Sequence, residues 1–391
     1  MTMDSLSKKV NRLIQPIVVH TQFIENRQIY TFFASGQIIE LPTRWLRFLS
    51  REPRYSLQTV RQYATNIKNL LTWFGWTEDY KNVPLDTVLT VCTRRDLQQW
   101  VLWQREANKA ASTIHSREAT VKEFFNWLTS EDAEQVRTAE NAIYKTGKLI
   151  SPAATKKRPR YLSPEAMILL LNGFHNESER CLAHTMFDVG LRISEALRLQ
   201  RGDLPNEREY AQGAKYFPLK VPGSKGRGGN TKERISIVSN PVLARIRRYH
   251  NSPEYRFSQH FNPNDLIKPI FLSANNSLLS ARNFNHQIKD AAERAGLNSA
   301  EFSAHKFRHG AAYSILKSEL GNDYFDKMVL VQQLFGHQQI KTTEIYASIP
   351  PAVLEQLNNN KAVVSKYEEA KEIYEATYLP PARHSERRGH R

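Results

Sequence analysis

Apolar residues recur at three- and four-residue spacing over much of the chain, the spacing that gathers side chains on one face of an α-helix. Between residues 40 and 140 this pattern comes in short segments, and Ser56, Thr93 and Ser112 stand where helix N-caps are expected. One-sided apolar stripes joined by short connections predict a compact helical bundle over this region. Before it, the stretch 17–34 holds two runs rich in β-branched and aromatic residues around a turn-like segment, which predicts a β-hairpin.

The second half of the chain combines further predicted helices with two short strands. Residues 145–160 contain glycine and proline among small and basic residues, which indicates a linker, and Ser163 followed by a proline marks the next helix start. Strands are predicted at 216–221 and 234–238, on either side of a Gly- and Lys-rich tip. The expected fold class is therefore mainly α with a small antiparallel β-sheet. Helices are predicted at about 163–174, 178–200, 280–295, 304–319, 327–335 and 361–378.

Charge indicates the class of partner. The 391 residues carry 55 Lys and Arg against 39 Asp and Glu, a formal net charge of +16, and residues 145–360 hold +11 of it. Basic side chains in the linker and Arg227 in the hairpin tip are suited to phosphates, because each phosphate neutralised releases counterions. We therefore expect a nucleic acid as partner, although charge that only keeps the linker soluble is an alternative. The linker residues concerned are Lys156, Lys157, Arg158 and Arg160.

Composition excludes several other classes of protein. A hydrophobic content of 40% with 10% aromatic residues is too high for a wholly disordered chain. The longest strongly apolar run, 166–171, is far shorter than the ~20 residues of a membrane-spanning helix, and the N-terminus lacks the pattern of a secretion signal. Two cysteines, Cys92 and Cys181, cannot form a disulfide framework. We expect a cytoplasmic protein with no membrane contact.

The informative polar residues stand where helix packing does not require them. An arginine lies three residues before a glutamate in an apolar segment, and a His-x-x-Arg pair shares one helical face. A second histidine follows a glycine that is expected to end a helix, and a tyrosine comes nine residues later. Each residue taken singly is typical of structural packing. Their order along the chain makes them informative: Arg192, a hairpin lysine, His305, Arg308, His337 and Tyr346.

In this order the motifs resemble those of the tyrosine recombinase (phage integrase) family, across about 160–350 and more loosely over 40–140. The segment around Arg192 is G-L-R-I-S-E-A-L, and the pair is H-K-F-R-H, with Phe307 where the family usually has leucine. The later segments are L-F-G-H and T-E-I-Y. Any one motif is weak, but the ordered set is specific. The resemblance implies a helical core-site DNA-binding domain and a catalytic domain that close on duplex DNA as a clamp.

The resemblance implies that Tyr346 attacks a DNA phosphodiester and gives a 3′-phosphotyrosine and a free 5′-hydroxyl, with no metal and no other cofactor. A phenol, with an ordinary pKa near 10, suits a group that must both attack phosphorus and leave again. Arg192 and Arg308 would bind the non-bridging oxygens with forked donors, and losing one such donor typically adds about 3–4 kcal/mol to the barrier. His305 would transfer a proton, and His337 would donate a hydrogen bond to the same phosphate.

A hairpin lysine would protonate the departing 5′ oxygen. The family's hairpin usually has the pattern G-K-G-x-x-K-x-R, whereas the tip here is longer, G-S-K-G-R-G-G-N-T-K-E-R. Lys225, flanked by glycine, is the candidate, and Lys232 is the alternative. Asp203 resembles a residue that lies behind the active site, and we expect it to be structural.

The resemblance and the charge together divide the chain into five segments. The segments are an N-terminal extension at 1–39, the core-site DNA-binding domain at 40–144, the basic linker at 145–160, the catalytic domain at 161–358, and a C-terminal helix with a disordered tail at 359–391.

We expect the N-terminal hairpin at 17–34 to cap an edge of the helical bundle, with an accessory arm-site DNA-binding element as the alternative. The predicted tail helix at 361–378 has an apolar stripe with no obvious place in its own domain. Our hypothesis is that this helix packs on a neighbouring protomer, and the alternative is that it docks on its own domain.

Other functions are compatible with parts of this pattern. His305 and His309 have the spacing of a helical zinc pair, but no glutamate follows the first and Arg308 lies between them, so we expect no metal. A type IB topoisomerase uses similar chemistry, and a DNA-binding protein could keep the fold without strand exchange. We favour a recombinase that acts as a tetramer on two duplex sites through a Holliday junction. The N-terminal extension and the tail favour the integrase or transposase of a mobile element.

Overall fold

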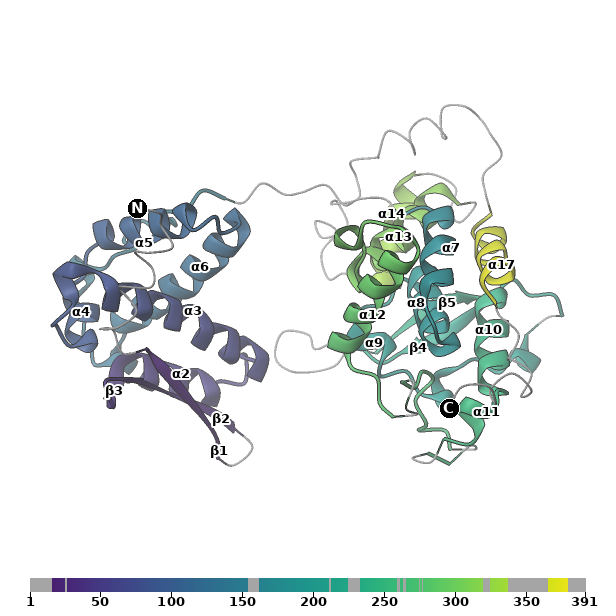
Figure 1. Cartoon of the computed structure of the whole chain (residues 1–391), viewed down its shortest axis with the longest axis horizontal. Coiled ribbons are helices and arrows are strands. Elements are labelled where there is room, and N and C mark those ends of the chain that lie inside the picture. The colour runs from purple at the N-terminus through teal and green to yellow at the C-terminus, as the bar shows by residue number, and fades with distance from the viewer. Residues whose placement is uncertain are drawn as a thin grey trace, which may run out of the picture. The chain divides into compact units, whose positions relative to one another are not determined.

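The computed structural model describes residues 16–24, 27–153, 162–210, 212–223, 233–258, 261–262, 265–273, 275, 277–318, 324–336 and 365–378. These residues fall into two compact units, one ending in the linker region and one beginning there (Figure 1). Both units are mainly helical and each contains a small antiparallel sheet, which confirms the predicted fold class. Among the described residues, every helix is too short or too polar to span a lipid bilayer.

A small sheet and a helical bundle form the N-terminal unit. The predicted hairpin is confirmed, and its second strand lies on helix α2, where the fully buried Phe32 donates its backbone N–H to the Thr43 hydroxyl (3.1 Å). This contact agrees with a hairpin that caps the edge of the bundle. The elements are β1 (Val18–Ile24), β2 (Arg27–Ala34), β3 (Gln37–Ile39), α2 (Glu40–Arg51), α3 (Leu57–Trp76), α4 (Leu85–Val91), α5 (Arg94–Glu106) and α6 (Ala111–Leu128).

Two of the three predicted N-caps begin helices of the bundle. The Ser56 hydroxyl accepts the backbone N–H of Thr59 (3.1 Å), and Thr93 forms a capping box with Asp96. The prediction for Ser112 is wrong, because α6 already begins at Ala111 and no side chain caps it.

The chain segment that follows the bundle is held against α6 by a buried carboxylate. Glu118 is fully buried and accepts the backbone N–H groups of Ile150 (2.5 Å) and Ser151 (2.7 Å) and the hydroxyl of Tyr144 (3.3 Å). These three hydrogen bonds fix the point at which the chain leaves the N-terminal unit toward the basic linker.

Helix α8 is the centre of the C-terminal unit, buried on every side from Ser178 to Val189. The predicted strands are confirmed as β4 and β5, which pair antiparallel with Val221 opposite Arg234. Helices α10 and α11 were not among the predicted ones. The elements are α7 (Pro164–Gly173), α8 (Glu177–Val189), α9 (Ile193–Ala196), β4 (Tyr216–Val221), β5 (Arg234–Ser239), α10 (Asn240–His250), α11 (Pro253–Arg256), α12 (Ala281–Arg294), α13 (Ala304–Lys317), α14 (Tyr324–Phe335) and α17 (Lys366–Thr377).

The helix predicted over 178–200 is wrong as a single element, because it breaks at Gly190. This glycine has φ +74°, the left-handed conformation that ends α8, and a Cβ there would lie 2.2 Å from the ring of Phe335. The chain is extended at Arg192 and then begins α9. Arg192 therefore does not lie within a helix, as the sequence pattern suggested, but caps the start of one.

The tail helix α17 docks on its own unit, which contradicts our hypothesis that it packs on a neighbouring protomer. It lies against α7, α8 and α10 (Figure 1). At its start the ammonium group of Lys366 contacts the Asp188 carboxylate (2.8 Å), with both side chains almost fully buried. At its end the buried Arg245 donates to the Thr377 hydroxyl (2.7 Å). Between these polar contacts, Ala370 and Ile373 of α17 are buried in the hydrophobic core of the unit.

Candidate active site

Arg192 is the partly exposed arginine of the candidate site. Its backbone N–H donates to one oxygen of Glu195 (2.9 Å) and its guanidinium donates to the other (2.8 Å). These two bonds, both donated by Arg192, tie the residue to the first turn of α9 and fix the direction of the arginine side chain. With 37% of the side chain exposed, the guanidinium is partly open to solvent.

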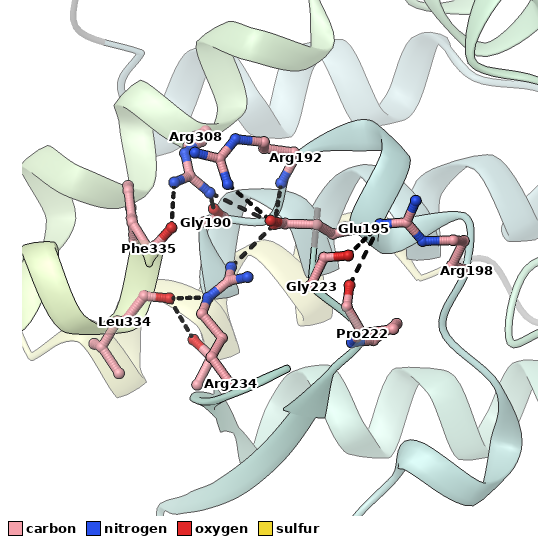
Figure 2. Close-up of polar contacts among 11 residues, drawn as sticks. Gly190, Arg192, Glu195, Arg198, Pro222, Gly223, Arg234, Arg308, Leu334 and Phe335 are labelled. Carbon is pink, nitrogen blue, oxygen red and sulfur yellow. Dashed lines mark hydrogen bonds and ion pairs between the residues drawn. The ribbon is translucent and has the colours of Figure 1, made fainter. Parts of the chain in front are cut away.

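Glu195 is the acceptor around which three arginines converge (Figure 2). Its fully buried carboxylate also accepts from Arg234 (3.0 Å) and lies 3.7 Å from the guanidinium of Arg308. Burial alone would raise the pKa of Glu195, but the hydrogen bond and charge of Arg234, the backbone N–H of Arg192 and the charge of Arg308 together lower it. The carboxylate is therefore ionised at neutral pH, and the four groups together carry a formal charge of about +2.

Arg308 connects this centre to two neighbouring turns. It lies on α13, is 2% exposed, and donates to the carbonyl oxygens of Gly190 (2.5 Å) and Phe335 (2.7 Å). Its guanidinium also lies 4.4 Å from the centre of the Phe335 ring. The side chain is thus fixed in place from both sides before any ligand is present.

His305 is the second residue of the same helix α13, one turn before Arg308. Desolvation of the ring, followed by the charges of Arg308 and Arg192, lowers its pKa, so the imidazole is neutral at pH 7 and able to accept a proton. The ring of His309 stands edge-on to it at 4.4 Å between centroids, and burial lowers the pKa of His309 to about 4. Within the described residues no group of three His, Cys, Asp or Glu side chains is arranged to bind a metal.

The hairpin between β4 and β5 is attached to helix α9 at both of its ends. Arg198, just after α9, donates to the carbonyl of Gly223 (2.7 Å), two residues after the first strand ends. Arg234, which opens the second strand, contacts Glu195 and donates to the carbonyl of Leu334 (2.8 Å) at the end of α14. Figure 2 shows these contacts on the two sides of Glu195.

The structure brings together some of the predicted site residues and does not describe others. Arg192, His305 and Arg308 lie in one cluster. Asp203 accepts the backbone N–H of Gln200 (2.8 Å), a capping contact at the start of a short 3₁₀ turn. The remaining candidates lie outside the described residues: Lys225, Lys232, His337, Tyr346, Lys156, Lys157, Arg158, Arg160 and Arg227.

Glu195 and Arg234 are the members of the cluster that sequence reasoning missed. Glu195 appeared there only as a helical partner of Arg192, although its spacing of three residues was a usable signal. Arg234 appeared only as a strand residue, because its partners come from α9 and from the distant end of α14. A cluster with an excess of forked cations around one carboxylate is suited to an oxyanion with several oxygens, such as a phosphodiester.

Comparisons with known proteins match both units. The "Phage integrase family" model matches residues 161–351, and the "Phage integrase, N-terminal SAM-like domain" model matches residues 43–132. Tyrosine recombinase XerD of Rickettsia bellii is 25% identical over 317 residues, covering 80% of this chain and 94% of that protein. Tyrosine recombinase XerC of Rickettsia typhi is 26% identical over 339 residues, covering 84% and 98%.

Solved structures show the same fold at lower identity. XerH site-specific recombinase bound to its palindromic difH substrate has a TM-score of 0.55 at 16% identity, over 78% of this chain and 80% of that chain. The Tn1549 transposon integrase in complex with circular intermediate DNA has a TM-score of 0.55 at 14% identity, over 81% and 98%.

Proposed function

The chain belongs to the tyrosine recombinase (phage integrase) family, whose members cleave and rejoin DNA through a phosphotyrosine intermediate, and we propose that the arginine cluster around Glu195 is its phosphate-binding site. The observation that supports this most strongly is the convergence of Arg192, Arg308 and Arg234 on one buried carboxylate. Such a cluster is organised before the DNA arrives, so its donors need little rearrangement as charge develops on the phosphate.

In the proposed mechanism, Tyr346 attacks the phosphorus while Arg192 and Arg308 bind the non-bridging oxygens. The neutral His305 accepts the phenolic proton, a role that its lowered pKa allows at pH 7. The bond from phosphorus to the 5′ oxygen breaks, and Lys225 gives that oxygen its proton, with Lys232 as the alternative donor. His337 donates a hydrogen bond to the same phosphate. The product is a 3′-phosphotyrosine, and attack by a second 5′-hydroxyl reverses the step.

We further propose that four protomers exchange strands between two duplex sites through a Holliday junction, with the two units closing on each duplex as a clamp. The linker residues Lys156, Lys157, Arg158 and Arg160, and Arg227 in the hairpin tip, would contact DNA phosphates. Fold similarity to XerH and to the Tn1549 integrase, both bound to DNA, supports this arrangement.

For the biological role we propose integration or transposition of a mobile element within the bacterial cytoplasm. The sheet β1–β3 and helix α17 lie outside the segments matched by the family models, which supports functions added to the shared core. Sequencing both flanks of the encoding gene would find element ends and a duplicated core site if this role is correct. Flanks without such repeats would favour a housekeeping resolvase.

The test of the enzymatic proposal is a covalent complex with DNA. The purified full-length chain is incubated with nicked duplexes that tile the DNA flanking its gene, and adducts are separated on denaturing gels. We expect an adduct that disappears in Tyr346→Phe and persists in Tyr210→Phe, a matched change at an exposed tyrosine. Retarded DNA with no adduct would leave only a DNA-binding protein of the same fold.

A further inference from the structure

Arg234 joins three parts of the catalytic unit through one side chain. It is the first residue of β5, where it pairs with Val221 across the hairpin. Its Nε donates to the carbonyl of Leu334 (2.8 Å) at the end of α14, and its Nη2 donates to Glu195 (3.0 Å) after the start of α9. The side chain is 12% exposed, so it is largely withdrawn from solvent.

Two arginines donate hydrogen bonds to the last carbonyl groups of α14. The last carbonyls of a helix have no partner within it, and cations are favoured there. Arg234 takes the carbonyl of Leu334 and Arg308 takes that of Phe335, and both guanidiniums lie beside Glu195. The position of Arg308 is thus coupled to that of Arg234 by a shared carboxylate and by adjacent carbonyls (Figure 2).

Close packing extends this coupling to the residue before His337. Gly336 has φ +63°, and a Cβ there would lie 3.0 Å from Cδ of Arg234. The backbone that leaves α14 therefore passes directly over the Arg234 side chain, one residue before a proposed phosphate ligand and ten before the proposed nucleophile.

We propose that Arg234 is a positioning residue for strand cleavage: it sets the placement of Arg192 and Arg308 through Glu195, and of the chain leading to His337 and Tyr346 through α14. It does this without contacting the DNA. The inference rests on the proposed function. The role requires a guanidinium group, because its Nε and Nη2 bind two separate acceptors, the carbonyl of Leu334 and the carboxylate of Glu195. A lysine ammonium group can reach only one of these acceptors at a time.

Arg198 provides the matched comparison. It also holds an end of the hairpin, through the carbonyl of Gly223, but it is exposed, and its hydrogen bonds in the described part of the chain go to Pro222 and Gly223 rather than to Glu195 or α14. Arg198→Met and Arg234→Met remove the same charge and one hairpin anchor each. They differ in the connection to Glu195 and α14.

The experiment compares Arg234→Met, Arg234→Lys and Arg198→Met as full-length proteins. It measures the single-turnover rate of adduct formation on the nicked duplex, the dissociation constant for the intact duplex in a Tyr346→Phe background, and the urea midpoint by circular dichroism. For Arg234→Met we expect the cleavage rate to fall about 100-fold, the loss typical of misplaced reacting groups, with the dissociation constant unchanged. Arg234→Lys should regain stability without regaining the rate, and Arg198→Met should lose far less rate.

Several results would overturn the inference. A cleavage rate for Arg234→Met equal to that of the unmodified chain excludes a positioning role. A rate that recovers together with stability in Arg234→Lys reduces Arg234 to a structural residue, and a DNA affinity that falls as far as the rate makes it a DNA ligand. Failure of the unmodified chain to form any adduct would instead reject the proposed function, and the positioning role with it.

Discussion

Replacing Glu195 by glutamine should destabilise the C-terminal unit and leave the N-terminal unit unchanged. The carboxylate accepts three hydrogen bonds, two from Arg192 and one from Arg234, and lies 3.7 Å from Arg308. The glutamine side chain has no negative charge, and its NH2 group would face the N–H donors of the arginines. Losing one member of a buried ion pair costs about 3–5 kcal/mol, and three buried or half-buried cations depend on this one, so we expect a loss in that range.

The distribution of tryptophan makes the assay selective. All 6 tryptophans, Trp45, Trp73, Trp76, Trp100, Trp103 and Trp127, lie in the N-terminal unit. Tryptophan fluorescence therefore follows that unit alone during urea unfolding, whereas far-ultraviolet circular dichroism follows both. With a urea slope of about 2 kcal/mol/M, the expected loss moves the C-terminal transition down by about 2 M while the fluorescence midpoint stays fixed.

The control is Glu293→Gln, the same chemical change at an exposed position on α12, which should shift neither transition by more than about 0.5 kcal/mol. A loss below about 1 kcal/mol in Glu195→Gln would refute the reasoning, because the arginines would then not need the carboxylate. A downward shift of the fluorescence midpoint would refute the independence of the two units.

Three further predictions concern His305, Lys366 and Glu118. Neutral His305 is the proposed proton acceptor and its pKa is lowered, so the rate of adduct formation should stay constant from pH 8 to below pH 6.5 and fall only at more acidic pH. A rate that is already halved at or above pH 6.5 would contradict this. Lys366→Met should leave Asp188 as an unpaired buried charge and lower the stability of the C-terminal unit by about 3 kcal/mol, measured by circular dichroism, whereas an unchanged midpoint would mean that α17 is not firmly docked. Glu118→Gln should lower the fluorescence-detected stability by about 2–3 kcal/mol because three hydrogen bonds weaken, and stability equal to the unmodified chain would show that residues 150–151 are held by other contacts.

The fold was largely predictable because its elements are marked locally. The caps at Ser56, Thr93 and Ser163 and the paired strands on either side of the Gly-rich tip are confirmed. Helix α10 was missed even though Pro241 in its first turn and its apolar positions mark it. The break at Gly190 was missed although glycine commonly ends a helix in the left-handed conformation, whereas the packing of the Phe335 ring against this glycine is not visible in the sequence.

The candidate site was predictable only in part, because some of its members are brought together by contacts between distant segments of the chain. Arg192, His305 and Arg308 stand in ordered motifs, so resemblance was enough to select them. The spacing of Glu195 from Arg192 was a local signal, but the contacts of Glu195 with Arg234 and Arg308 join segments far apart in the sequence, and no local pattern records them. The docking of α17 on its own unit was missed because it combines a buried ion pair, Lys366 with Asp188, with the burial of Ala370 and Ile373, and the partners of these residues come from distant segments.

The most direct test of the account is to identify the residue that carries the DNA. Cleavage by trypsin after Lys341 and Lys361 releases residues 342–361, which contain a single tyrosine, Tyr346. After nuclease digestion of the covalent complex, mass spectrometry should find this peptide carrying a nucleotide joined through its 3′-phosphate to Tyr346. A nucleotide on any other peptide, or one joined through its 5′-phosphate, would contradict the account.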